Sequence, residues 1–140
     1  DIGRGASPGN KFEPGKKPMS TMAPTIIFDK DDKLFLITGS PGGSDIPAAI
    51  LRVITGVIDF DLDIGEATML PRIHKDWPYT DLEHERALSR DIIRKLESMG
   101  HETEYETTIG STQSIHIDNG INNGFADLRR PNAGVSIQSN

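Results

Sequence analysis

Apolar residues fall into two short runs early in the chain, residues 25–28 and 34–38, with the polar segment 29–33 between them. β-branched and aromatic residues dominate both runs, and a short polar turn between such runs predicts a β-hairpin. Both runs are almost continuously apolar, which is typical of strands covered on both faces. We therefore expect a hairpin whose two faces are both covered.

A helical period follows this hairpin, because apolar residues recur every three or four positions from residue 46 to residue 58. Ser44 or Asp45 can cap the start of this helix, and Pro47 suits its first turn. The pattern predicts a buried helix with a continuous apolar side. Its expected inward side chains are Ile46, Ile50, Val53, Ile54, Val57 and Ile58.

Two further helices are predicted by the residues at their ends. Asp63 and Glu66 have the spacing of a capping box, which opens a short helix that Pro71 ends. Ser89 is suited to cap a longer helix, and Gly100 is suited to terminate it. The expected inward side chains of this longer helix are Ile92, Ile93, Leu96 and Met99.

The remaining pattern predicts short strands and loops. Strands are expected at residues 82–86, 102–107, 112–117 and 124–127, with a turn at 118–120 and irregular chain at 72–81. Residues 1–18 hold four glycines and three prolines, which is typical of a loop, and the polar residues 129–140 predict a surface tail. A hairpin, then helices, then further strands predict an α+β fold with a largely antiparallel sheet and helices packed on it.

Composition limits the partners more than it limits the fold. The 140 residues carry a net charge of −6 and a sequence pI near 5.1, which disfavours nucleic acid and anionic membranes as partners. The longest apolar runs are far too short to span a bilayer. The absence of cysteine excludes disulfides, thiolate zinc sites and cysteine nucleophiles. A chain of this length is one domain or a piece of one.

The histidines give no sign of a metal site. All four are scattered, and no pair has the spacing of histidine ligands on one helix. No metal and no cofactor are therefore expected. A Ser–His–Asp triad stays open, because nothing in the sequence selects one serine. The histidines are His74, His84, His101 and His116.

Candidate chemistry lies in the turn 38–44, Thr-Gly-Ser-Pro-Gly-Gly-Ser, between the second strand and the first helix. A tight turn before a helix N-terminus collects unpaired backbone N–H groups and the positive end of the helix dipole. Gly42 and Gly43 let the main chain approach a ligand closely. A bound anion, or an oxyanion formed during a reaction, belongs there. A nucleotide phosphate loop is disfavoured because the Gly-Lys-Ser/Thr ending is missing, whereas a plain turn without a ligand stays open.

A second candidate is the pair Ser20 and Thr21, which lies between Pro18 and Pro24. Proline biases the preceding residue toward an extended backbone, so the segment should present both hydroxyls to a ligand. Two adjacent hydroxyls can hold a carboxylate by hydrogen bonds. Taken alone this signal is weak, since Ser-Thr pairs are common in loops.

These two stretches, in this order, resemble the small subunit of γ-glutamyltranspeptidases. The first is Lys-Lys-Pro-Met-Ser-Thr-Met-Ala-Pro-Thr at residues 16–25, and the second is the turn 38–44. The resemblance continues in chain order to about residue 134 and begins near residue 10. Its further matches are Glu-Ala-Thr at 66–68, Pro-Arg-Ile-His at 71–74, Gly-Ser-Thr-Gln-Ser at 110–114 and Ala-Asp-Leu-Arg at 126–129.

The resemblance implies an N-terminal-nucleophile hydrolase, an αββα sandwich made as a precursor that cleaves itself. The new N-terminal threonine attacks a γ-glutamyl amide such as glutathione, and the acyl group passes to water or to an amino acid. By resemblance, Gly42 and Gly43 would donate backbone N–H groups to the oxyanion. Ser20, Thr21 and Gly43 would bind the γ-glutamyl substrate, the two hydroxyls by holding its α-carboxylate.

The sequence also departs from the family pattern. Thr21 stands where the family usually has a second serine, and Asp76-Trp77 stands where Gln-Trp is common. No counterpart of the nucleophilic threonine is found in residues 1–10. Residues 1–140 are therefore expected to be a single fragment, the C-terminal portion of the small subunit, which is inactive alone.

The implied partners are the remainder of the small subunit and the large subunit of the same precursor. The resemblance also implies a periplasmic or secreted protein. Two alternatives stay open. One is a homologous acylase that acts on β-lactam side chains or poly-γ-glutamate, and the other is a non-catalytic domain that only assembles with a partner chain.

Overall fold

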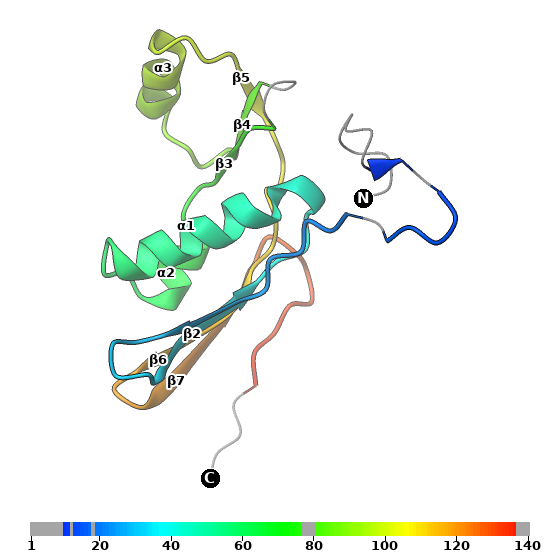
Figure 1. The fold of residues 1–140 in the computed structure, drawn as a ribbon. Coiled ribbons are helices and arrows are strands. Elements are labelled where there is room, and N and C mark those ends of the chain that lie inside the picture. Colours follow the sequence, from blue (N-terminus) through cyan, green and yellow to red (C-terminus); the bar gives the residue numbers. More distant parts are fainter. Residues whose placement is uncertain (1–9, 12, 18, 77–80, 137–140) are drawn as a thin grey trace.

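The computed structural model of the chain describes residues 10–11, 13–17, 19–76 and 81–136. Within them, seven strands form two sheets, and three α-helices and a 3-10 turn accompany these sheets (Figure 1). In chain order the elements are β1 Thr25–Phe28, β2 Leu34–Gly39, η2 Gly43–Asp45, α1 Ile46–Ile58, α2 Ile64–Met69, β3 Ile73–His74, β4 Leu82–His84, α3 Arg90–Ser98, β5 Thr103–Tyr105, β6 Gln113–Asp118 and β7 Ile121–Ala126. Most of the expected N-terminal loop, as well as Pro18 and Trp77, lies outside the described residues.

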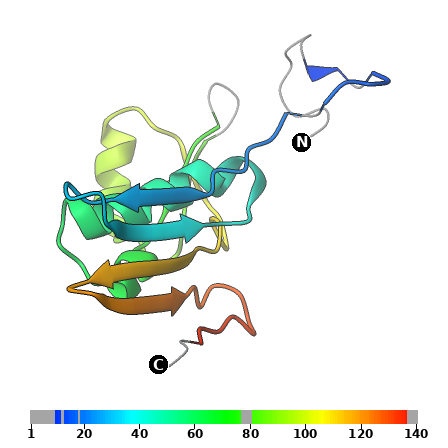
Figure 2. The ribbon, with the colours of Figure 1, turned by 60° about the horizontal axis from the view of Figure 1, so that its bottom comes forward.

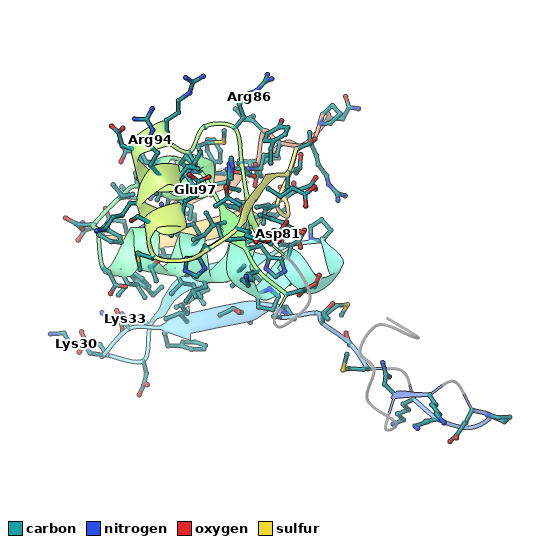
Figure 3. All side chains as sticks on the ribbon, turned by 90° about the horizontal axis from the view of Figure 1, so that it is seen from above. Lys30, Lys33, Asp81, Arg86, Arg94 and Glu97 are labelled. Carbon is teal, nitrogen blue, oxygen red and sulfur yellow. The ribbon has the colours of Figure 1, made fainter. Side chains whose placement is uncertain are left out.

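The larger sheet has the strand order β1-β2-β6-β7, and all of its pairs are antiparallel (Figure 2). The predicted hairpin is confirmed as β1 and β2. Asp29 shapes its turn, because its carboxylate accepts the amides of Asp31 and Lys33 at 2.8 and 2.9 Å. Lys30 and Lys33 project from this end of the sheet (Figure 3). The expected antiparallel sheet is therefore present.

Helices α1 and α2 pack on one face of this sheet (Figures 1 and 2). The capping box is confirmed, since Asp63 accepts the Glu66 amide at 2.8 Å and the Glu66 carboxylate accepts the Asp63 amide. Asp45 is the N-cap of α1 but makes no side-chain capping bond, because η2 runs directly into the helix. The buried core cluster consists of Leu36, Val53, Val57, Ile64 and Ala67.

The register shows which face of the larger sheet the helices leave uncovered. Ile26, Ile37 and Ile115 are in register across three strands, and the neighbouring row contains the fully buried Leu36. Ile26 is 59% exposed and Ile115 is 41% exposed. The expectation that both faces of the hairpin are covered is therefore wrong for the described chain, because α1 and α2 cover only the Leu36 side.

The smaller sheet has the order β3-β4-β5 and lies with α3 on the other side of α1 from the larger sheet (Figure 1). Strand β4 pairs antiparallel with β3 and parallel with β5. Residues 72–81 were expected to be irregular, yet Ile73 and His74 form β3 by pairing with His84 and Glu83. A two-residue strand carries too little periodicity to be predicted.

Helix α3 is capped by Ser89, whose hydroxyl accepts the Ile92 amide, as predicted. Its apolar side chains are less covered than expected, because the helix packs mainly against the short strand β5. Met99 is 64% exposed, Ile92 is also exposed, and no residue of α3 is buried. In α1 the expected inward residue Ile58 is likewise exposed.

None of the helices formed by the described residues is long and apolar enough to cross a membrane.

The contact between α1 and α2 depends on a glycine inside α1. A Cβ placed on Gly56 would lie 2.8 Å from the Cβ of Ala67, which is closer than real Cβ atoms approach. Replacing glycine by alanine in a helix normally stabilises it by about 1 kcal/mol. We expect Gly56→Ala instead to lower the free energy of unfolding by about 1–3 kcal/mol, as overpacked cores do, in urea denaturation followed by circular dichroism.

The double variant Gly56→Ala with Ala67→Gly is the control, because it removes the atom that the new methyl group meets. It should regain part of the lost stability. A Gly56→Ala protein that is more stable than the wild type would show that the two helices do not meet at this position.

Candidate active site

The glycine turn leads from the end of β2 into α1 through two residues with positive φ. Gly42 has φ 144° and Gly43 has φ 65°, conformations that side-chain-bearing residues rarely adopt. Neither amide is a donor in the loop hydrogen bonds found among the described residues. The first amides of a helix have no partner within that helix. The turn therefore offers backbone N–H donors at the start of η2, as the sequence indicates.

A second glycine segment packs against this turn. A Cβ on Gly42 would lie 3.3 Å from the Cα of Gly110, and a Cβ on Gly110 would lie 2.8 Å from the Ser40 hydroxyl. That hydroxyl donates to the Pro41 carbonyl at 2.7 Å and accepts the Ser111 amide at 2.9 Å. The position of the turn is thus set by residues 110–111, which precede β6.

Arg72 fixes this supporting segment. Its side chain is 1% exposed and donates to the carbonyl of Ile109 at 2.9 Å, to that of Thr68 at 3.0 Å and to the Asp127 carboxylate at 2.7 Å. The same Asp127 oxygen accepts the Thr112 amide at 2.9 Å. Both ends of the segment between Ile109 and Thr112 are therefore bound to one buried ion pair.

A second ion pair adjoins the first. The Arg129 side chain donates to both oxygens of Glu85, at 2.6 and 2.7 Å, and to Asp127 at 3.1 Å. Glu85 also accepts the amides of Arg72 and Ile109. Two arginines and two carboxylates therefore alternate in a balanced cluster. The surface tail was expected to begin at Arg129, but this side chain belongs to the interior and the exposed chain starts one residue later.

The cluster shifts the pKa of each of its carboxyls downward. Burial by itself raises the pKa of Glu85, but hydrogen bonds from Arg129, Ile109 and Arg72 outweigh this effect and lower it. Burial likewise raises the pKa of Asp127, and the Arg129 amide and the charge of Arg72 more than reverse this. For Arg72, burial and then the charge of Arg129 lower the pKa. The carboxyls of Glu85 and Asp127 are therefore charged near neutral pH.

Ser20 and Thr21 lie on the segment that precedes β1. The pairing of Thr25 with Thr38 brings this segment to the end of the larger sheet where β2 enters the glycine turn (Figure 2). Ser20 is exposed, and its hydroxyl accepts the Met22 amide at 3.1 Å. Gly42 and Gly43 are thus adjacent in one turn, whereas Ser20 is not hydrogen bonded to them in the described residues. The binding roles of all four residues stay predictions.

One group of potential metal ligands was not predicted from the sequence, where no metal site was expected. The ligand atoms of Asp45, His74 and Glu83 all lie within 4.8 Å of one another. These residues come from three elements, so no local spacing could have revealed them. His84 and His116 make ring contacts with Tyr105 and Phe35 instead.

Comparison with known proteins decides the family. The family model described as gamma-glutamyltranspeptidase matches residues 2–137. The chain belongs to the γ-glutamyltranspeptidase family. Two similar curated relatives are glutathione hydrolase proenzymes. The one from Escherichia coli strain K12 is 42% identical over 108 residues, or 77% of this chain, and the one from Bacillus subtilis strain 168 is 39% identical over 137 residues, or 94%.

Solved structures of γ-glutamyltranspeptidases share the fold. An acivicin-inhibited γ-glutamyltranspeptidase has a TM-score of 0.84 and 34% identity, with 89% of this chain and 69% of that chain covered. One from Helicobacter pylori has a TM-score of 0.82 and 33% identity, with the same coverage. The expected fold class is confirmed: this is an α+β part of an N-terminal-nucleophile αββα sandwich.

The chain spans about a fifth of the length of the curated relatives that it matches, 18% of the Escherichia coli proenzyme and 23% of the Bacillus subtilis one. The two stretches that contain the ion pair, residues 71–74 and 126–129, were among the family matches in the sequence. Their contact in space was not predicted.

The Arg72 cluster predicts a loss of stability in acid. The ordinary pKa values are 4.5 for Glu85 and 3.8 for Asp127, and both are lowered in the folded chain. The stability that these carboxylates contribute is therefore complete above about pH 4.5 and is lost as pH falls through the lowered values. We expect the free energy of unfolding, from urea titrations at pH 7 and pH 3, to fall steeply on acidification.

Asp127→Asn removes one charge of the cluster and should lower the free energy of unfolding at pH 7 by about 3–5 kcal/mol, because it leaves Arg72 buried without its counter-charge. Its further loss at low pH should be smaller than in the wild type. Asp118→Asn, at an exposed position at the end of β6, is the matched control and should change stability by less than about 0.5 kcal/mol. Equal effects of the two variants would contradict the assignment.

Proposed function

We propose that this chain supplies the oxyanion-binding turn and part of the γ-glutamyl binding site of a γ-glutamyltransferase and glutathione hydrolase. The observation that carries this proposal is the turn at Gly42 and Gly43, with two positive φ angles immediately before a helix. Amides at such a position match an oxyanion in charge and in hydrogen bonding. The glutathione hydrolase proenzymes among the relatives support the same chemistry.

In the proposed reaction, an N-terminal threonine supplied from outside these 140 residues attacks the γ-carbonyl carbon of the donor. The carbonyl oxygen gains negative charge as the C–O bond to threonine forms, and the amides of Gly42 and Gly43 bind that charge. Breaking the C–N bond releases the amine, which takes up a proton. Water or the amine of an amino acid then attacks the γ-glutamyl ester, and threonine leaves with its hydrogen restored.

Ser20 and Thr21 are proposed to hold the α-carboxylate of the γ-glutamyl group. Both hydroxyls can donate to a carboxylate oxygen, and the sheet register brings their segment to the end where the glycine turn lies. A carboxylate bound here and an oxyanion bound at Gly43 would fix the two ends of the γ-glutamyl unit. The position of the scissile bond would follow from these two anchors.

The proposed partners are the remainder of the small subunit and the large subunit, made from one precursor. The relatives' description as proenzymes supports this arrangement. We infer that the 140 residues alone do not turn over substrate, because they would supply the oxyanion turn without the nucleophile. A periplasmic or secreted location is proposed on family membership.

The oxyanion role predicts that a methyl group at Gly42 lowers activity, whereas one at Gly39 leaves activity unchanged. Gly42→Ala places a side chain at φ 144° and 3.3 Å from the Gly110 Cα, whereas a Cβ on Gly39 meets nothing within 4 Å. In the longer protein that contains this chain, Gly42→Ala should lower kcat about 10²-fold, and Gly39→Ala should leave kcat within about twofold. Release of p-nitroaniline from γ-glutamyl-p-nitroanilide measures this.

Gel electrophoresis must show that both variants are processed to the same extent as the wild type, so that kcat refers to mature enzyme. The 140-residue chain assayed alone gives the background. Full activity of a processed Gly42→Ala enzyme would overturn the oxyanion role, and turnover by the 140 residues alone would overturn the inferred external nucleophile.

The carboxylate role predicts that the two hydroxyls matter for the donor. Ser20→Ala and Thr21→Ala should each lower kcat/KM on the same anilide. The loss should correspond to an increase of about 1–3 kcal/mol in the activation free energy, since each variant removes a hydrogen bond to a charged group. Thr21→Ser keeps the hydroxyl and should retain most of the activity. A processed parent protein that is inert on γ-glutamyl anilide but cleaves another amide would favour the acylase alternative, and an unprocessed one would favour the non-catalytic domain.

A further inference from the structure

Three potential metal ligands converge beside the start of α1. Asp45 ends η2, His74 lies on β3, and Glu83 lies on β4 directly opposite His74 in the strand pairing. One ligand atom from each residue lies within 4.8 Å of the other two. The cross-strand pair fixes two of the ligands on one face of the smaller sheet, and η2 brings the third.

The imidazole of His74 is aimed into this group. Its side chain is only 10% exposed, and Nε2 lies 3.6 Å from Asp45 Oδ1 and 3.0 Å from Asp76 Oδ1. A histidine ring held in this way has lost most of its rotational freedom already. Binding at Nε2 would therefore require little further ordering of the ring.

The group also concentrates negative charge. Burial raises the pKa of Glu83, the charge of His74 opposes this, and the carboxylates of Asp45, Glu106 and Asp76 raise it further. Three further carboxylates thus act on Glu83 beside the imidazole of His74. A bound dication would convert their repulsion into attraction.

We propose that Asp45, His74 and Glu83 bind one transition-metal dication of the Zn²⁺ type, each through one atom. One imidazole nitrogen and two carboxylate oxygens suit Zn²⁺, whereas Mg²⁺ and Ca²⁺ prefer ligand sets made only of oxygen. The metal uses the lone pair of Nε2, so the ring hydrogen sits on Nδ1 and the Nε2–Asp76 contact is given up. Water fills the remaining position.

The geometry needs only a small adjustment. Ligands about 2.0–2.2 Å from Zn²⁺ lie roughly 3.3–3.6 Å apart in a tetrahedron. His74 Nε2 already lies 3.6 Å from Asp45 Oδ1, and no two of the three ligand atoms are more than 4.8 Å apart. A shortening of at most about 1.5 Å is therefore needed, which side-chain rotation of Asp45 and Glu83 can supply. The bound ion would join β3 and β4 to η2, two residues beyond Gly43. This site has no part in the proposed reaction and does not depend on it.

Isothermal titration calorimetry tests the proposal on the full-length protein after removal of any affinity tag. ZnCl₂ should bind at one ion per chain, and MgCl₂ and CaCl₂ should give no heat at the same concentrations. His74→Gln should weaken Zn²⁺ binding at least about tenfold. His84→Gln is the matched control, because His84 lies on the same small sheet with its ring near Tyr105, and it should bind Zn²⁺ as the wild type does.

A second variant covers the case in which His74→Gln does not fold. Glu83→Gln removes one oxygen ligand at a position that is only partly buried, and it should also weaken Zn²⁺ binding. Visible absorption of the Co²⁺-loaded wild-type protein should show the intense bands of a tetrahedral site. Folded wild-type protein that takes up no Zn²⁺ at up to millimolar concentration, or binding that His74→Gln and Glu83→Gln leave unchanged, would overturn the proposal.

Discussion

The buried pair of Arg72 and Asp127 is the interaction on which the described structure most depends. Removing two charges from water is costly, and the cost is met only where further hydrogen bonds satisfy both groups. Here the guanidinium also donates to two carbonyls, and the carboxylate also accepts two amides. These bonds join the end of α2, the segment before β6 and the chain after β7. Loss of Arg72 would remove the two carbonyl bonds, and loss of Asp127 would remove the two amide bonds.

The same cluster determines where the glycine turn lies. Thr112 and Ile109 are bound to the ion pair, and Gly110 between them touches the turn at Gly42 through its backbone. Two main chains can approach this closely only because both positions lack a Cβ. The turn is therefore held by contacts that reach from β4 to the end of β7. The backbone N–H donors at Gly42 and Gly43 belong to the turn itself, which local sequence determines.

The difference between local features and contacts across distant parts of the chain explains what the sequence could and could not predict. The hairpin, α1, the Asp63 capping box and the glycine turn each depend on neighbours within a few residues, and all were predicted. Arg72 and Asp127 are 55 positions apart, and no period links them. The family resemblance marked both stretches but could not show that they meet. Asp45, His74 and Glu83 were missed for the same reason, since the two sheets have to form before these residues come together.

The uncovered face of the larger sheet follows from the architecture of the family. Ile26, Ile37 and Ile115 form an apolar row on the side away from α1 and α2, and a sheet with only one covered face would normally alternate apolar and polar residues. An αββα sandwich stacks two sheets face to face, so a second sheet would bury this row. The continuous apolar pattern of residues 25–28 thus fits the two-sheet sandwich, although the described elements cover only one side.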